Sequence, residues 1–334
     1  MGSETVFDQV GRHNFAHLKG LVMQQAEDHA CLYRGNDCQF VAALEASNPV
    51  ARTLLLRDQY NAASLGYVLY SRNYGFKGKG LYIEDICVSR DRRSSGTGMR
   101  LMRGLAEIAQ VELATSISWV VARNNPLAIQ FYERAGAQPL PYSGYDCADL
   151  FDNKSVLPNG YEVKKFESDE KDFLRATLLG YEQAQNKVDN ILLAVDAEHA
   201  NVYAAYKQGV LVALGISNSN FSSFRTVYGY KLEFLELEGQ DVNRNCAAFE
   251  AIAHRVCQDA HDYDHTGHLN LFIQKASESQ CAFVTKMRVS PLRMSDDPKS
   301  FLDMYSLSGA ALFGHAGLNP YSTQGEHFSF AAAA

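Results

Sequence analysis

The chain has 334 residues, of which 46% are hydrophobic and 21% charged, and its formal net charge is −7. One hydrophobic core rarely serves so many residues, so two domains of roughly 150 residues each are expected. The negative charge argues against a nucleic-acid ligand, whose phosphates require a basic face. No segment approaches the ~20 apolar residues of a membrane span, and residues 1–10 lack the pattern of a signal peptide.

The seven cysteines are scattered along the chain without a C-x-x-C pair. This usage is typical of free thiols in a reducing compartment, so we expect a cytoplasmic protein. His254, His261, His265 and His268 lie close together with aspartates between them, which admits a divalent-ion site. A solvated helix end and loop is the commoner origin of such a run, and we therefore expect no metal.

The first half begins with a helix and a hairpin. Apolar residues at helical spacing predict a helix over residues 15–28. Two apolar runs, 51–56 and 65–70, predict strands joined by the polar turn 57–61. Together these elements indicate a strand pair with a helix before it.

A loop and a third strand are expected next. Residues 71–80 are rich in Gly, Lys and Asn, which is typical of a loop. The strand 81–88 is mostly apolar but contains Glu84 and Asp85. Side chains alternate along a regular strand, so if Glu84 faces a pocket, Asp85 is expected to face the other side of the sheet.

Helices and strands then alternate. A loop over residues 89–98 leads into an amphipathic helix, 99–113, and a β-branched run, 116–121. Pro126 suits the first turn of a further helix that ends at Gly136, and the two preceding asparagines are candidate caps. This order predicts an α/β layered fold.

The second half resembles a repeat of the first. Gly66 matches Gly215 at an offset of 149 residues (215 − 66), and Glu84 matches Glu233 at the same offset. Around Phe131 the matches drift by three residues. A constant offset over two strands favours an internal repeat over two unrelated domains of similar element spacing.

The second copy keeps the scaffold and loses the polar residues. Asn125 corresponds to Ser277, and Tyr132 corresponds to Val284. The glycine-containing loop of the first copy has no glycine at the matching positions. The chemistry is therefore expected in the first half.

The loop Arg93-Ser94-Ser95-Gly96-Thr97-Gly98 lies between a predicted strand and a predicted helix. Alternating glycines let the backbone turn tightly, so that successive N–H groups at the positive end of the helix can face one pyrophosphate. The spaced glycines of a dinucleotide fingerprint and the Gly-Lys-Ser/Thr of a Walker loop are both missing from it.

Two motifs carry a family resemblance. Arg93-x-x-Gly96-x-Gly98 after an apolar strand resembles the acyl-CoA signature of the GNAT superfamily of N-acetyltransferases. Asn125-x-x-Ala128-Ile129-x-Phe131-Tyr132-x-x-x-Gly136-Ala137 is similar to the downstream motif of the same superfamily. The two motifs stand in the family's order, which is more specific than either one alone.

A further resemblance points to one branch of that superfamily. Gly80-Leu81-Tyr82-Ile83-Glu84-Asp85-x-x-Val88, with Gly66-Tyr67-x-Leu69-Tyr70 before it, is similar to the diamine and small-amine acetyltransferases over roughly residues 13–145. Two positions depart from that branch: Ser94 replaces a glycine after the loop arginine, and Asn124 replaces an aromatic or acidic residue. These departures leave the preferred acceptor open.

The resemblance implies roles for individual residues. Glu84 would be the base that takes the ammonium proton, with Asp85 as the second candidate, and both would contact the acceptor. Tyr132 would protonate the leaving thiolate. The contacts to acetyl-CoA, the implied co-substrate, are expected from the strand backbone of Ile86, Cys87 and Val88, from the loop Arg93, Ser94, Ser95, Gly96, Thr97, Gly98 and Met99, and from Asn125, Ala128 and Tyr132.

The resemblance and the repeat together predict an α/β (α+β) protein of two tandem GNAT-like domains. Each would be a mixed, mostly antiparallel sheet flanked by helices. Residues 1–150 would be the acetyl-CoA-binding catalytic domain and 151–160 a linker. Residues 161–320 would be a degenerate GNAT-like domain and 321–334 a C-terminal tail.

The expected activity is direct transfer of an acetyl group to the primary amine of a polyamine-like or amino-acid-like small molecule. A protein or peptide amine is the alternative acceptor. A non-catalytic acyl-CoA-binding regulator and a tandem interaction module are the non-enzymatic alternatives. A small-molecule amine is the expected partner, without nucleic acid or membrane, and both a homodimer and a monomer with pseudo-dimeric domains remain open.

Overall fold

The computed structural model describes residues 5–146, 157–180, 184–237, 241–263, 268–287, 290–291 and 302–308. The predicted tail and most of the predicted linker lie outside these ranges, and the domain boundaries stay a prediction. Of the helices in the described ranges, none combines the length and the apolar character that crossing a bilayer requires.

The first half contains β1 (Thr5–Asp8), α1 (Phe15–Asp28), α2 (Asp37–Glu45), β2 (Arg52–Asp58), β3 (Ser64–Gly75), β4 (Gly78–Val88), η1 (Arg90–Arg92), α3 (Thr97–Val111), β5 (Ser116–Ala122), α4 (Pro126–Arg134) and β6 (Gln138–Asp146). The second half contains β7 (Tyr161–Lys165), η2 (Ser168–Glu170), α6 (Lys171–Gly180), α7 (Gln185–Val195), β8 (Ala200–Lys207), β9 (Val210–Ser222), β10 (Val227–Glu236), α8 (Val242–Tyr263), β11 (His268–Gln274), α9 (Glu278–Met287), β12 (Ser290–Pro291) and β13 (Leu302–Ser308).

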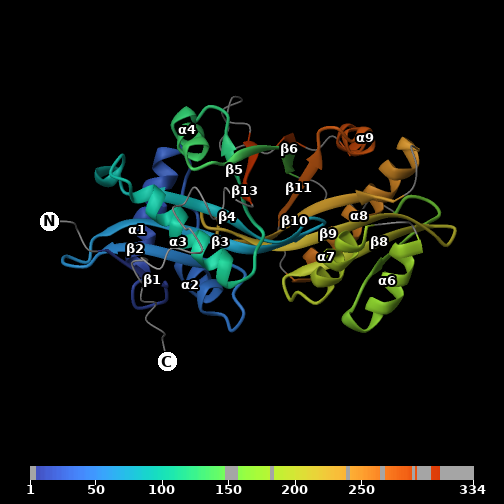
Figure 1. Ribbon diagram of the computed structural model, residues 1–334, viewed down its shortest axis with the longest axis horizontal. Coiled ribbons are helices and arrows are strands. Elements are labelled where there is room, and N and C mark those ends of the chain that lie inside the picture. The colour runs from blue at the N-terminus through green and yellow to red at the C-terminus, as the bar shows by residue number, and fades with distance from the viewer. Residues whose placement is uncertain are drawn as a thin grey trace.

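All described strands join one sheet that runs the length of the molecule (Figure 1). The strand order is β1-β2-β3-β4-β5-β13-β6-β11-β10-β9-β8-β7, and β12 pairs with β6. Only β4–β5 and β10–β11 are parallel. The predicted mostly antiparallel sheet with flanking helices is confirmed, but as one continuous sheet rather than two.

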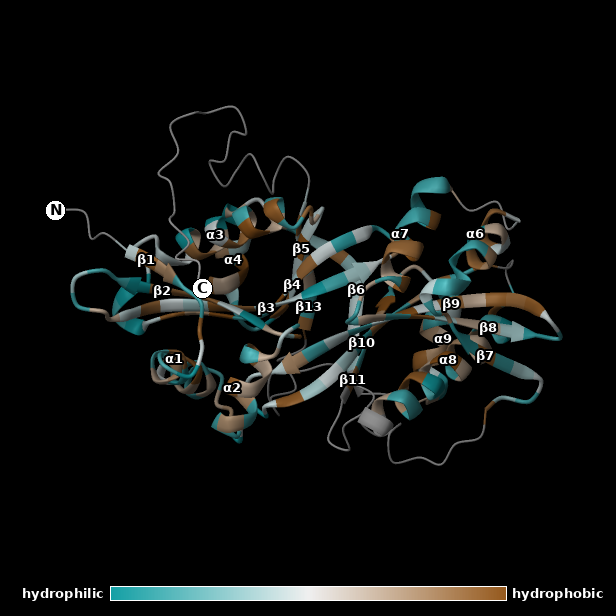
Figure 2. Ribbon diagram, turned by 90° about the horizontal axis from the view of Figure 1, so that it is seen from below, coloured by the Kyte–Doolittle hydropathy of each residue, from teal (hydrophilic) through white to brown (hydrophobic). Residues whose placement is uncertain are grey.

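The element order of the first half recurs in the second, as the repeat predicted. Two helices follow the first strand of each half, and one helix connects the two parallel strands of each half. In Figure 2, α3 and α4 cover one face of the sheet in the first half, whereas the corresponding α8 and α9 cover the opposite face in the second half. The two halves are therefore arranged like the subunits of a two-fold dimer.

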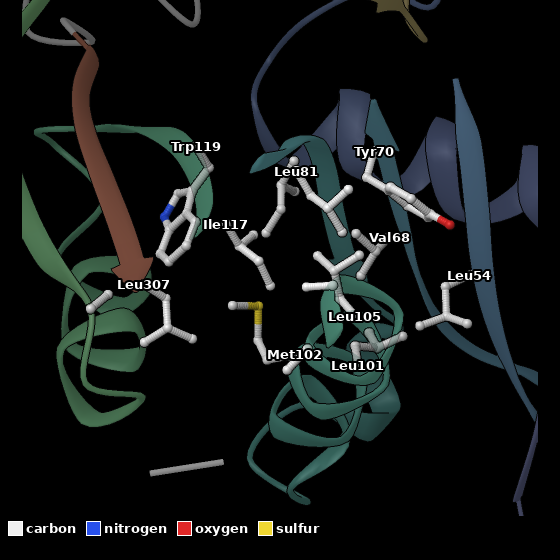
Figure 3. Packing of buried hydrophobic residues seen from close by; sticks show 14 of the residues in the cluster. Leu54, Val68, Tyr70, Leu81, Leu101, Met102, Leu105, Ile117, Trp119 and Leu307 are labelled. Atoms are coloured by element: carbon white, nitrogen blue, oxygen red, sulfur yellow. The ribbon is translucent and has the colours of Figure 1, made fainter. Parts of the chain in front are cut away.

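Helix α3 is held by its apolar face against the first-half sheet. Leu101 and Leu105 are fully buried in a cluster with strand residues that include Val68 and Ile117 (Figure 3). Gly104 brings the helix close to the strands, because a Cβ there would stand 2.8 Å from the ring of Phe7. This packing fixes the N-terminal end of α3 next to the end of β4.

The last strand of each half pairs inside the other half. β13 lies between β5 and β6, and β6 in turn pairs with β11. Leu307 of β13 belongs to the first-half core beside Ile117 and Trp119 (Figure 3). The two halves thus exchange strands, and the core of the first half is incomplete without residues near the end of the chain.

The two central hairpins also cross over. The predicted loop 71–80 is wrong: β3 continues to Gly75 and β4 starts at Gly78. These polar strand ends pair with each other, from Ser71–Tyr82 to Gly75–Gly78. They also contact the other half, where the Asn218 side chain accepts from the Tyr74 amide at 2.7 Å and donates to its carbonyl at 2.7 Å. Reciprocally, Phe221 of β9 packs against Phe40 of the first half, with ring centroids 5.2 Å apart.

The strand register refines the repeat. Gly66 pairs with Val88, whereas Gly215 pairs with Phe234. Because the two glycines correspond to each other, their partners Val88 and Phe234 also correspond. The offset between β4 and β10 is therefore 146 residues (234 − 88) rather than the 149 expected from the sequence. The helices α4 and α9 start at residues 126 and 278, an offset of 152, as the three-residue drift predicted.

Leu307→Ala should destabilise the whole protein, although the residue lies in the last described strand. Leu307 is 2% exposed, and such core truncations cost about 2–5 kcal/mol of unfolding free energy. Ser308→Ala, at the exposed neighbouring position, is the control. Urea unfolding of both variants makes the comparison, and a cost below about 0.5 kcal/mol for Leu307→Ala would remove β13 from the first-half core.

Candidate functional site

The parallel strands β4 and β5 separate after a short contact. Only Leu81–Ile117 and Tyr82–Ser118 pair, although β4 continues to Val88 and β5 to Ala122. β4 follows β3 as far as the Gly66–Val88 pair, and β5 follows β13 along its full length. Past this contact, each strand pairs only with its own antiparallel partner. Beyond Tyr82, the β5-facing peptide groups of β4 are outside the ladder and open to a ligand.

The predicted phosphate loop follows β4 and leads directly into α3. Gly96 has a φ of +86°, which favours glycine, and Ser94 is also left-handed with a φ of 60°. No side chain caps the helix at Gly96. The amide N–H groups of the first turn, from Thr97 onward, can therefore donate to an anion at the positive helix end.

The loop is tied to α1 by charged and amide side chains. Asp28 pairs with Arg93 and, at 2.7 Å, with Arg90. Burial alone would raise the pKa of Asp28, but the hydrogen bonds from Arg93 and Arg90 lower it below its usual value. Gln24 donates to the Val88 carbonyl at 3.2 Å and accepts from the Arg90 amide at 3.1 Å. Arg93 is thus a loop anchor here, with a half-exposed guanidinium.

The two sequence motifs lie in contact. A Cβ on Gly98 would stand 3.2 Å from the ring of Phe131, so glycine allows α3 and α4 to approach closely. The Asn125 side chain caps α4 by accepting from the Ala128 amide at 3.1 Å, as predicted. The downstream motif therefore forms one wall of the opening whose other edge is the loop.

Tyr132 is buried at the base of this wall. Its ring packs 4.7 Å from Trp119 and 5.2 Å from Phe131, measured between centroids, and the residue is 6% exposed. Burial raises the pKa of Tyr132 well above its usual value, and the nearby charge of Asp85 adds to the rise. The phenol therefore stays protonated at neutral pH and is able to donate a proton.

A β-bulge changes the geometry that regular alternation predicts. Leu69 pairs with Asp85 and Tyr70 with Ile83, which leaves Glu84 as an extra residue in β4. Glu84 accepts from Ser71 at 2.8 Å, and Asp85 accepts from Gln25 of α1 at 3.3 Å. Both carboxyl groups therefore lie on the α1 face of the sheet, and the expectation that they face opposite sides is wrong.

Glu84 is already neutralised. Lys231 of β10 donates to it at 2.7 Å, and the two side chains are 3% and 10% exposed for Lys231 and Glu84 respectively. Sequence reasoning missed Lys231, whose only signal was a lone basic residue in a mostly apolar strand.

Asp85 has no cationic partner among the interactions of the described residues. Burial raises its pKa to about 7, a hydrogen bond with Ser223 lowers it, the charge of Glu84 raises it, and the bond from Gln25 lowers it. Gln25 is itself held by the Tyr67 hydroxyl, which donates to it at 2.6 Å. A carboxyl group of this pKa, whose charge also acts on the Tyr132 phenol, suits proton transfer near neutral pH.

The corresponding region of the second half is filled. β10 and β11 stay paired over five residues, from Gly229–His268 to Glu233–Phe272. Next to this ladder, Phe234 packs 4.5 Å from Phe249 and 5.5 Å from Phe283, measured between ring centroids. In this described region, a longer ladder and packed aromatic rings therefore stand where the first half has its strand separation.

The polar residues near the start of α8 and α9 bond to one another within the second half. Ser277 caps α9 as Asn125 caps α4, accepting from the Gln280 amide at 3.1 Å, and its hydroxyl donates to Glu236. Asn245 donates to the same carboxylate at 3.2 Å. The second half thus has the same scaffold, but its Ser277 and Asn245 side chains bond within the fold.

Two other features lie apart from this site. Within the described residues no three His, Cys, Asp or Glu side chains gather at metal-binding distance, and His265 is outside them. A polar cavity of about 440 Å³ is lined by residues of both halves, including Arg72 and His199. None of its lining residues belongs to β4, β5, α3 or α4.

Comparison with known proteins identifies the first-half arrangement. Residues 22–137 match the model of the acetyltransferase (GNAT) family, and this stretch contains both motifs and the β4–β5 opening. The chain therefore contains a GNAT acetyltransferase domain, as the sequence motifs predicted.

Named relatives resemble the same stretch. A thialysine N-epsilon-acetyltransferase of Bos taurus is 33% identical over 85 residues, which cover 25% of this chain and 50% of the relative. An L-ornithine N5-acetyltransferase of Arabidopsis thaliana is 38% identical over 90 residues, 26% of this chain and 40% of the relative. The chain thus spans half or less of the length of these relatives.

The tandem arrangement has a structural parallel. A tandem GNAT protein from the clavulanic acid biosynthesis pathway superimposes with a TM-score of 0.52 over 91% of this chain and 98% of its own, at 12% identity. At this identity the likeness concerns the fold, and it confirms the predicted tandem of GNAT-like halves.

Gly96→Ala should weaken binding of CoA at least tenfold. No atom lies within 4 Å of a Cβ at this position, so the methyl group would project into the space before the loop, and the left-handed backbone would be strained by roughly 1–2 kcal/mol. Gly209→Ala is matched, because Gly209 has a φ of +75° and equally open space but lies in the β8–β9 turn.

Isothermal titration with CoA, together with urea unfolding, separates the two effects. Both variants should lose similar stability, and only Gly96→Ala should lose affinity. Equal affinity in the two variants would place the CoA phosphates away from this loop.

Proposed function

We propose that the protein is an N-acetyltransferase that moves the acetyl group of acetyl-CoA directly to the primary amine of a small molecule. The observation that carries this proposal is the opening between β4 and β5, bordered by an uncapped helix terminus on one side and by Tyr132 and Asp85 on the other. The GNAT domain match and the small-amine acetyltransferases among the relatives support it.

The co-substrate would occupy the opening. The N–H groups at the start of α3 and the loop from Arg93 would bind the pyrophosphate. The β5-facing peptide groups of β4 around Ile86, Cys87 and Val88 would bind the pantetheine arm and polarise the thioester carbonyl. Asn125 and Ala128 lie at the α4 end of the same opening.

The acceptor would approach from the α1 face. Asp85 takes a proton from the ammonium group, and the neutral amine nitrogen then attacks the thioester carbon. The C–N bond forms, the C–S bond breaks with its electron pair leaving on sulfur, and Tyr132 donates the proton that completes the thiol. The acetylated nitrogen then loses its remaining excess proton, which returns to the Tyr132 phenolate, and Asp85 releases the first proton to solvent. We assign the base to Asp85 and give Glu84, the first candidate from the sequence, a role in shaping the acceptor pocket, because Lys231 already holds it.

Tyr132→Phe should lower kcat by roughly 10²-fold while the KM for acetyl-CoA changes by less than about twofold, because a proton donor is lost and the ring packing stays. Thiol release from acetyl-CoA is measured against a panel of diamines, monoamines, amino acids and peptide N-termini. Tyr70→Phe removes a phenol from the same core cluster and should leave kcat within about twofold.

The panel also decides between activities. Turnover of one small-amine class supports the proposal. A preference for peptide N-termini would instead identify a protein or peptide amine as the acceptor. CoA binding without turnover of any amine would contradict an enzyme and favour a regulatory acyl-CoA-binding protein.

The activity should increase with pH through the titration of Asp85. Its carboxylate is the active form, so kcat/KM should rise as pH increases through about 7 and fall tenfold for each pH unit below that value. The charged group facing it is Glu84, itself paired with Lys231, and the neighbouring titratable groups, which are uncharged at this pH, are Tyr67, Tyr82, Cys87 and Tyr132. In Asp85→Asn the rate should be low and this acidic limb should disappear. Persistence of the same limb in Asp85→Asn would assign it to another group.

A further inference from the structure

The second half reaches across to the acceptor side of the site. Ser223, which is 3% exposed and follows β9, hydrogen-bonds Asp85. Lys231 of β10 binds Glu84, the neighbouring residue in the bulge. Both carboxyl groups of the first-half site are therefore contacted by side chains of a half whose own opening is filled.

Lys231 is held by three contacts. Its Nζ lies 2.7 Å from Glu84 Oε1, 3.2 Å from Ser71 Oγ and 3.4 Å from the centre of the Tyr82 ring. Burial lowers the pKa of Lys231, while the charge of Glu84 raises it. A buried ion pair of this kind contributes little net stability, but removal of one partner leaves the charge of the other buried and uncompensated.

The register shows what Lys231 replaces. Leu69 pairs with Asp85 in the first half, and Asn218 pairs with Lys231 in the second. Asn218 corresponds to Leu69 at the same offset that joins the two glycines, 149 residues (218 − 69). The second half therefore carries a cation at its counterpart of Asp85, and this cation is directed into the first-half site.

The contact is fixed rather than adjustable. The β9–β10 turn binds the connection between α1 and α2: the Arg34 amide donates to the Phe224 carbonyl at 2.8 Å, and the Asn36 amide donates to Thr226 Oγ1 at 2.7 Å. A Cβ on Gly35 would stand only 2.4 Å from the Thr226 methyl group. Backbone hydrogen bonds and close packing thus hold the second half against the acceptor side.

We propose that Lys231 is a specificity-determining residue: by neutralising Glu84 it leaves Asp85 as the one unpaired carboxyl group at the bulge, so that the site prefers acceptors with one ammonium group over those with two. The inference rests on the proposed function. A second ammonium group finds no free carboxylate beside Asp85, and it meets the charge of Lys231 nearby.

The test compares 1,4-diaminobutane with butylamine as acceptors, measured as kcat/KM for thiol release from acetyl-CoA. Lys231→Met keeps the length of the side chain and removes its charge, so the diamine-to-monoamine ratio should rise at least tenfold. Glu84→Gln leaves the lysine charge uncompensated, and the ratio should fall. The double variant Glu84→Gln/Lys231→Met is again neutral, and its ratio should return to within about threefold of the starting protein.

The outcomes separate the two proposals. If Lys231→Met does not fold, the fall in Glu84→Gln and its reversal in the double variant still test the inference. Active variants whose ratio stays unchanged would overturn the role of Lys231 and leave the acetyltransferase proposal intact. No turnover of either amine by the starting protein, nor of any other amine in the panel, would overturn both.

Discussion

The short parallel contact between β4 and β5 is the constraint on which the site depends. Pairing stops after Tyr82 and Ser118, while β4 stays with β3 and β5 stays with β13. Because β13 comes from near the end of the chain, the opening in the first half is set partly by the second. The uncapped start of α3, the wall formed by α4 and the bulge in β4 all border this separation, which brings them to one site.

The second half has the same fold, but the residues at the positions of the first-half site pack or bond within the protein. Where the first half opens, Phe234, Phe249 and Phe283 pack together, and Ser277 is bonded to Glu236. Its remaining polar residues point outward from its own core: Asn218 holds the β3–β4 hairpin, and Lys231 and Ser223 reach the two acids of the GNAT domain. The exchanged strands and crossed hairpins make this a pseudo-dimer within one chain.

The sequence predicted what is local and periodic. The helix over 15–28, the cap at Asn125 and the glycine turn before α3 follow from residue type and spacing, and the tandem repeat from a constant offset. It did not predict what depends on distant partners. The polar ends of β3 and β4 pair with each other, but their composition predicts a loop because the Asn218 side chain that holds them comes from the second half. The strand pattern favours Glu84 over Asp85 as the base, because it predicts neither the bulge nor the contact with Lys231.

The stoichiometry of CoA binding tests the central claim most directly. One CoA is expected for each 334-residue chain by isothermal titration, with the loss of that single site in a Gly96 variant and its retention in variants of Ser277. Two sites per chain, or one site that survives changes in the loop and disappears with changes in α9, would contradict the assignment of the chemistry to the first half.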